Sequence, residues 1–284
     1  MTRRLRIAVI GHVEHVTLGR VPAIPQAGDI THLEAPVTIA GGGGGVAFWQ
    51  LVASDAEVHL FTALGDDDAA AFVADQLAGA AATVHAARRR AAHTRDLVMI
   101  DPSGERTIAV VGQPLHPRAD DPLPWDLLGE LDAVYFTADD AAILARARAA
   151  RLLIATARRQ PAIAAAGVRL DAVVGSRSDP REVSTLADYA PPPAALIMTD
   201  GPRGGVVHTA GAAVAFAAPP TIVRGGAYGA GDSFAGAFVY HLAAGATPVA
   251  AATRAAAHGA AVLASIDPLA AQRPLPGAGA RPAR

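Results

Sequence analysis

The residues best suited to chemistry lie in the segment GGAYGAGDSFAGAF, residues 225–238, where a glycine-rich turn runs into an amphipathic helix. Asp232 lies at the junction. Free backbone N–H groups in the first turn of a helix bind anions such as phosphate, helped by the helix dipole. Gly229 and Gly231 let the backbone approach such an anion closely. Asp232 could then accept the proton of an alcohol while the N–H groups stabilise a phosphoryl group in transit.

Asp232 also fits a simpler role, as an N-capping residue after a flexible loop. The position of the segment favours chemistry, because it follows a long α/β pattern and precedes a helix of small residues.

A second glycine-rich segment, Gly41 to Gly45, precedes a helix expected over residues 46–53. It could let the backbone lie against a small polar ligand, with the helix N-terminus supplying N–H donors. The alternative is a flexible strand-to-helix turn. Because five glycines cost conformational entropy on folding, we favour the ligand-binding interpretation.

Three other motifs are weaker. The acids of LGDDDA, residues 64–69, suit helix N-capping better than a metal site, because adjacent residues rarely converge on one ion. In TDGPRGG, residues 199–205, a hydroxyl and the glycine backbone could contact a nucleotide phosphate or form a plain turn. His12 and Glu14 end the first strand on one face, and the lack of an HExxH pattern argues against a zinc site.

The composition excludes several classes of function. The 284 residues include no cysteine, and all 24 basic Lys+Arg residues are arginine. Without lysine, a P-loop and Schiff-base chemistry are impossible. A net charge of −2 without a basic stripe argues against nucleic-acid binding. No apolar run is long enough for a membrane span, and the first apolar run predicts a strand, so we expect a cytoplasmic protein.

Apolar runs alternate with helical patterns along the chain. The predicted strands are 5–10, 58–63, 133–136, 152–155, 172–174 and 194–199, and the predicted helices are 46–53, 69–77, 141–150, 233–243 and 248–264. Continuous apolar strands between helices indicate a mostly parallel sheet covered on both faces.

Two β-like excursions, at about residues 13–39 and 94–112, interrupt this alternation. They could form a small lid over the edge of the sheet where ligands bind, or be ordinary β decoration. Exposed lid edges would favour a homodimer. We expect one domain over residues 1–270, and a disordered tail over 271–284, which is rich in Pro, Gly and Ala.

Taken in order, these pieces resemble the ribokinase-like (PfkB) family of carbohydrate kinases over about the first 265 residues. The resemblance rests on the glycine run, LGDDD, GERTI at 104–108, TDGPRGG and, most specifically, GAYGAGDSFAGAF. It implies a three-layer α/β fold with a mostly parallel sheet and a small β lid. It also implies transfer of the γ-phosphoryl group of ATP, with Mg²⁺, to an alcohol of a small-molecule acceptor.

The resemblance also assigns roles. Asp232 would be the catalytic base, with the anion hole at Gly229, Ala230 and Gly231. The other implied positions are Thr199, Gly201, Gly204 and His258 for ATP; Glu14, Gly41, Gly42 and Gly43 for the sugar; and Asp179 for the metal. Arg95 and Arg106, on the expected lid, could meet an anionic substrate, although ordinary surface arginines are the simpler interpretation.

The chain departs from the family pattern mainly at the substrate end. Val16 aligns with the usual sugar-binding aspartate, Gly45 or Val46 with the usual Asn, and Gly226 with the Asp that opens DTxGAGD. SRSD, residues 176–179, aligns with the family's Asn-x-x-Glu. These losses suggest an unusual acceptor, or a non-catalytic ligand sensor on the kinase fold. A dinucleotide-dependent oxidoreductase is a weaker alternative, because the turn after the first strand lacks GxGxxG.

Overall fold

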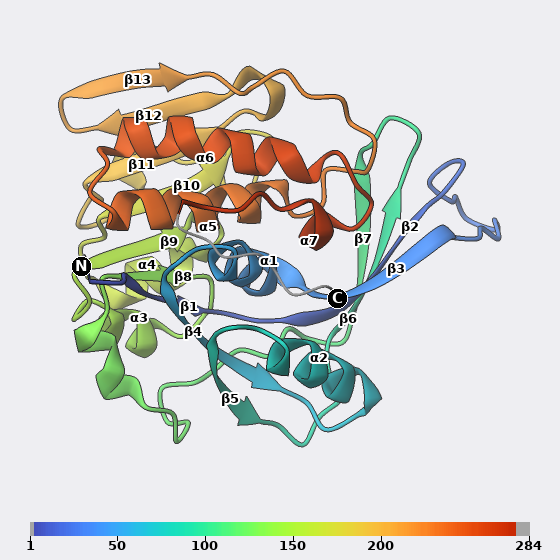
Figure 1. Ribbon diagram of the computed structural model, residues 1–284, viewed down its shortest axis with the longest axis horizontal. Helices are drawn as coiled ribbons and strands as arrows, with labels where there is room; N and C mark the ends of the chain where they lie inside the picture. The colour runs from blue at the N-terminus through green and yellow to red at the C-terminus, as the bar shows by residue number, and fades with distance from the viewer. Residues whose placement is uncertain (1–2, 277–284) are drawn as a thin grey trace.

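The computed structural model describes residues 3–276 and contains two β-sheets (Figure 1). The larger sheet has nine strands in the order β13-β12-β11-β10-β9-β8-β1-β4-β5. The pairs from β11 to β5 are all parallel, and β12 and β13 are antiparallel additions at one edge. In chain order the strands are β1 (Arg6–Ile10), β4 (Glu57–Leu64), β5 (Thr83–Arg88), β8 (Ala133–Phe136), β9 (Leu152–Thr156), β10 (Ala172–Ser176), β11 (Ala195–Thr199), β12 (Gly205–Thr209) and β13 (Ala212–Phe216).

Helices cover both faces of this sheet, as the continuous apolar strands require. In β1, Ile7 and Val9 pack into one core, whereas Ala8 and Ile10 pack into the other. The first core is covered by α1 (Gly42–Val52), α2 (Asp68–Ala78), α5 (Ala230–Ala243), α6 (Pro248–Val262) and α7 (Pro268–Ala271). The second is covered by η1 (Trp125–Glu130), α3 (Ala141–Ala147) and α4 (Gln160–Ala166). The predicted three-layer α/β fold is confirmed.

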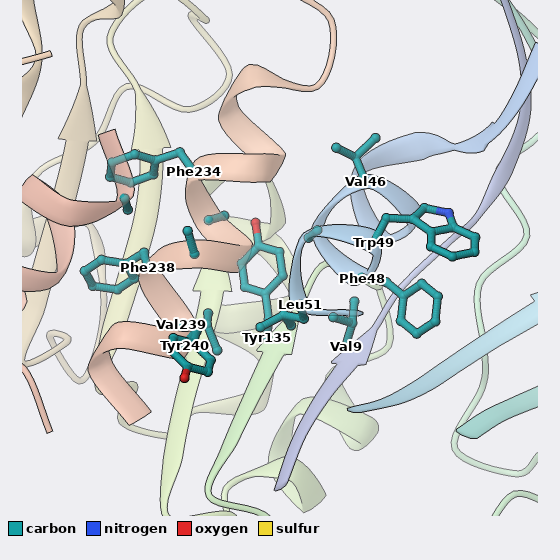
Figure 2. Close-up of a cluster of buried hydrophobic side chains, with 14 of the residues drawn as sticks. Val9, Val46, Phe48, Trp49, Leu51, Tyr135, Phe234, Phe238, Val239 and Tyr240 are labelled. Carbon is teal, nitrogen blue, oxygen red and sulfur yellow. The ribbon is translucent and has the colours of Figure 1, made fainter. Parts of the chain in front are cut away.

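Helices α1 and α5 lie next to each other over the centre of the sheet (Figure 2). Phe48 and Leu51 of α1 and Phe238 of α5 are fully buried there. A Cβ at Gly236 would lie 2.7 Å from the carbonyl oxygen of Ala47, so only glycine permits this close approach. This packing fixes the N-terminal turns of the two helices relative to each other, and those turns carry both glycine-rich segments.

The smaller sheet projects from one end of the body (Figure 1). Its strands are β2 (Glu14–Arg20), β3 (Glu34–Gly41), β6 (Arg95–Ile100) and β7 (Arg106–Val111), in the order β3-β2-β6-β7. The sheet is mixed, because β2 and β6 are parallel while the other two pairs are antiparallel. Strands β2, β6 and β7 fall within the two expected lid segments, whereas β3 continues to Gly41, past the expected end at about residue 39. The division of the chain into domains stays a prediction.

The structure differs from the sequence-based expectations at three places. The glycine run is not a loop, because α1 begins at Gly42. Strands β5, β12 and β13 and helices α4 and α7 were not predicted, since their alanine-rich or short sequences carry little periodicity. The start of the expected disordered tail is packed: Leu275 is buried, and its N–H donates to the carbonyl of Ala53 over 2.7 Å. Residues 277–284 of that tail lie outside the described residues.

Among residues 3–276, no helix combines the length and apolarity that crossing a membrane requires.

Candidate active site

Asp232 lies in the first turn of α5. Gly229, at the N-cap, has φ +78°, a left-handed conformation that favours glycine, and this conformation turns the chain into the helix. Gly231 is exposed, and a Cβ added there would meet nothing within 4 Å. Because the first-turn N–H groups of a helix lack intrahelical acceptors, this open turn can receive an anion beside the Asp232 carboxylate.

Asp232 is half-buried and faces the glycine run of α1. A Cβ on Gly43 would lie 3.3 Å from Asp232 Oδ1. Burial raises the pKa of Asp232 to about 6, and the negative charge of Glu182 acts in the same direction, against Arg158 and Arg106. A carboxylate with a pKa just below neutral pH is suited to act as a general base.

The glycines of α1 are required by close contacts rather than by flexibility. A Cβ on Gly44 would lie 2.5 Å from the carbonyl oxygen of His12, and one on Gly41 would lie 2.8 Å from the hydroxyl of Tyr228. The N–H of Gly42 donates to that hydroxyl over 2.8 Å. Tyr228, which belongs to the GAYGAGD motif, therefore joins the turn before α5 to the start of α1.

Two buried carboxyl groups lie on the inward face of the lid. Glu14, the first residue of β2, is 5% exposed, and Asp96 on β6 is 6% exposed. Burial raises the pKa of both, and the two are hydrogen-bonded to each other, so they share a proton. Glu14 Oε2 would lie 2.8 Å from a Cβ on Gly42. The sequence pointed to Glu14 but not to Asp96, whose place depends on the pairing of β6 with β2.

A group of basic side chains lies near the glycine run. The N–H of Gly43 donates to His12 Nε2 over 3.3 Å, and the rings of His12 and His116 meet edge to face at 5.0 Å. Arg159 donates to the carbonyl of Thr137 over 2.8 Å and lies 3.3 Å from His116 Nε2. Burial lowers the pKa of His12 well below its ordinary value, and repulsion from His116 and Arg159 adds to this effect. His12 is therefore neutral at physiological pH.

Asp179 does not have free oxygens for a metal. Arg158 contacts it at 2.5 Å and also contacts Glu182 at 2.7 Å, and Arg181 approaches from the other side at 3.3 Å. Burial acts to raise the pKa of Asp179, but the hydrogen bonds from Arg181 and Arg158 outweigh it and lower the pKa to about 2. Within residues 3–276 no group of three or more His, Asp or Glu side chains could hold a metal ion. The residues therefore do not fit the metal site expected at Asp179.

The other expected nucleotide-binding residues lie in two places, at the end of β11 and on α6. Thr199 donates to the carbonyl of Gly175 over 3.1 Å at the end of β11, and exposed Gly201 follows with φ +53°. Gly204 is buried. A Cβ there would lie 2.0 Å from the carbonyl oxygen of Phe216, so this glycine is required for packing. His258 is also buried, on α6. Its ring centroid lies 6.0 Å from that of His241 on α5.

Arg95 does not point toward the carboxyl pair. Its guanidinium forms an ion pair of 2.8 Å with Asp67, the N-cap residue of α2, and donates to the carbonyl of His93. Because side chains alternate along a strand, it is the next residue, Asp96, that faces inward. The capping role expected for the LGDDDA acids is present, since Asp67 accepts from the N–H of Ala70 over 3.1 Å.

The lid also accounts for one departure from the family pattern. A Cβ on Gly226 would lie 2.8 Å from Cδ1 of Ile100 on β6, so the lid fills the space that a longer side chain would need. The lid turn makes a further contact here, because the N–H of Ala227 donates to the carbonyl of Gly104 over 3.0 Å. The turn before α5 is thus packed directly against the lid.

Comparisons with known proteins agree with this architecture. A model of the pfkB family of carbohydrate kinases matches residues 169–272. Ribokinase from Thermotoga maritima has a similar structure, with a TM-score of 0.77 at 15% identity, covering 95% of this chain and 96% of the ribokinase. Adenosine kinase from Sinorhizobium meliloti gives 0.76 at 14% identity, covering 97% of each chain. Phosphofructokinase-2 from Escherichia coli gives 0.72 at 16% identity, covering 94% and 97%. No curated protein matches the sequence.

The fold is thus that of ribokinase-like proteins, and residues 169–272, which include the turn at Asp232, are similar to the pfkB family of carbohydrate kinases. The resemblance to the ribokinase-like (PfkB) family is confirmed, and both that family and the structural neighbours are carbohydrate kinases.

Proposed function

We propose that the protein is an ATP-dependent phosphotransferase that moves the γ-phosphoryl group of ATP to an alcohol of a sugar-like molecule. The observation that carries the proposal is the position of Asp232, which lies beside an open helix N-terminus and against the glycine run of α1. Asp232 takes the proton of the acceptor hydroxyl as its oxygen bonds to phosphorus. The bond from phosphorus to ADP breaks, and the N–H groups at Ala230 and Gly231 stabilise the charge.

The nucleotide side is formed by α5 and the end of β11, where Thr199 and Gly201 lie. Any Mg²⁺ would be held mainly by the nucleotide phosphates, as is common for this ion. We place such a kinase in the cytoplasm, where ATP is available.

We also propose that the lid pairs with the lid of a second copy. Ile108, Val110 and Val111 of β7 are 41–59% exposed and form an apolar edge.

The direct test replaces Asp232 with asparagine, which keeps the shape and removes the base. We expect kcat/KM for ADP release with an active acceptor to fall by about 10²- to 10⁴-fold, while thermal stability at neutral pH does not fall, because the buried carboxylate is itself costly there. The wild-type rate should rise with pH and level off above a pKa of about 6.

Retained activity in the Asp232→Asn variant would overturn the assignment. Stabilisation by nucleotide without ADP release for any acceptor would favour the alternative, a ligand sensor built on the same fold.

A further inference from the structure

We infer that the acceptor carries a cationic amine beside its reactive hydroxyl, and that Glu14 and Asp96 bind this amine. The inference rests on the proposed function, because it names the class of molecule that Asp232 would activate.

The first step is the lack of a paired counter-charge. Glu14, Asp96 and Asp232 come from three different elements, and the charges of Asp96 and Asp232 both act on Glu14. Within residues 3–276, no arginine forms an ion pair with any of the three: Arg159 acts on Glu14, and Arg158 and Arg106 act on Asp232, only from beyond ion-pair distance. The chain contains no lysine. The basic group nearest to Glu14 is His12, at 3.8 Å, and burial keeps it neutral. A buried acidic group without a cation is costly, so a bound cation would be strongly favoured.

The second step is an unsatisfied atom. Asp96 is only 6% exposed, and its Oδ1 has no hydrogen-bond partner in the chain. Asp96 lies on the inward side of β6 with Val98 and Ile100, which places it toward Glu14 and the body. Buried polar atoms almost always have a partner, and apart from the proton shared with Glu14 this oxygen has no donor, so it is placed to accept one from a ligand.

The third step is that a single small molecule can contact both Glu14 and Asp232. Glu14 Oε2 lies against Gly42, and Asp232 Oδ1 lies against Gly43. Consecutive Cα atoms are about 3.8 Å apart, so one molecule of hexose size can contact both carboxyl groups. Such a molecule could offer its ammonium to Glu14 and Asp96 and its hydroxyl to Asp232.

The chemistry favours an amine over a metal ion. The three carboxyl groups are not arranged to hold a metal, since no group of three or more ligands within the described residues qualifies. An ammonium has three donors for directional hydrogen bonds to carboxylate oxygens, and it tolerates the mixed contacts that Tyr228 and the glycine backbone offer. A neutral polyol could also donate to these oxygens, but it would leave the charge uncompensated.

The test compares amino sugars with their neutral counterparts. Glucosamine is compared with glucose and N-acetylglucosamine, and 1-amino-1-deoxyfructose with fructose, at pH 7, by thermal shift without nucleotide and by ADP release with ATP and Mg²⁺. We expect an amino sugar to act at a concentration at least about tenfold lower than its neutral match. Glu14→Gln and Asp96→Asn should remove that preference, whereas the matched control Glu34→Gln, an exposed carboxylate on β3, should keep it.

Two outcomes would overturn the inference: no amino sugar of the panel stabilises the protein, or the preference survives in both carboxyl variants.

Proton release is a further readout, beside thermal shift and ADP release, because an ammonium should displace the proton that Glu14 and Asp96 share. Calorimetry in two buffers at pH 7 should show release of about one proton with the amine and none with the neutral sugar.

The inference and the proposed function can fail separately. Binding of amines that depends on Glu14, without ADP release for any probe, would contradict the kinase and support the amine site. Equal ADP release with neutral and amino sugars, lost in Asp232→Asn, would support the kinase and overturn the amine site.

Discussion

Two groups of carboxylates interact electrostatically with Asp232, and they differ in how their charge is compensated. Asp179 and Glu182 are bridged by Arg158, at 2.5 and 2.7 Å. Glu14 and Asp96 are buried against each other, and within residues 3–276 no arginine forms an ion pair with either of them. The pKa of Asp179 is lowered to about 2, whereas the pKa of Glu14 is raised well above its ordinary value.

The difference shows which carboxylates have their charge compensated within the protein and which do not. A compensated cluster can stabilise the fold on its own, while an uncompensated one costs stability until a ligand arrives. Asp232 titrates near neutral pH because burial and Glu182 raise its pKa more than Arg158 and Arg106 lower it. We therefore interpret the Arg158 cluster as structural support and the Glu14–Asp96 pair as a binding surface.

The largest effect should come from Arg158→Met, which would leave Glu182 without its cation and Asp179 with only the exposed Arg181. Breaking a buried ion pair costs about 3–5 kcal/mol, but the Arg158 side chain is 35% exposed, so we expect about 2 kcal/mol. The pKa of Asp232 should also rise, because a positive charge is removed. Urea unfolding measures the first effect, and the pH dependence of ADP release measures the second.

The matched control is Arg203→Met, which breaks the exposed ion pair with Asp200 and should cost less than about 1 kcal/mol. If the two arginine variants lost equal stability, Arg158 would not be the centre of a compensated cluster. The wild-type protein should in addition lose stability as the pH falls below the ordinary value of 3.8 and through about 2, because Asp179 then becomes protonated.

Glu14→Gln should raise the stability of the protein, whereas Arg158→Met lowers it. Below the ordinary pKa of 4.5, both folded and unfolded chains hold the Glu14 proton, and the variant should match the wild type. Between 4.5 and about 9, only the unfolded chain loses that proton, so the wild type becomes progressively less stable than the variant. We expect the stability advantage of the variant to grow from pH 5 to 6.5 to 8, measured by urea unfolding at these three values. A variant that is less stable at every pH would mean that Glu14 is already compensated.

The sequence predicted those features that depend on neighbouring residues. The body strands follow from apolar runs, and the turn at Asp232 follows from one continuous motif. The site as a whole depends on pairings between distant segments, such as Glu14 with Asp96 and Arg158 with Asp179, which local patterns do not contain. Only the strand register and the packing of layers place these residues together.

The glycine run illustrates a related limit. Each glycine in a helix costs about 1 kcal/mol relative to alanine, so propensity favours a loop over residues 41–45. The helix forms because close contacts around Gly41 and Gly44 exclude any side chain, and packing against α5 stabilises the segment. Tertiary contacts thus outweigh local preference where the backbone must lie close to its neighbours.

The smallest effect concerns Arg95, where sequence and structure disagree about the role of one residue. Because Arg95 is held by Asp67, we expect Arg95→Gln to leave KM for the acceptor within about twofold, while Asp96→Asn changes it. Asp67→Ala should cost about 1 kcal/mol of stability, since it removes the N-cap of α2 as well as the ion pair. Steady-state kinetics and urea unfolding on the three variants separate these effects. A large rise in KM for Arg95→Gln with unchanged stability would return Arg95 to the substrate site, and would mean that the lid binds its ligand through an outward as well as an inward side chain.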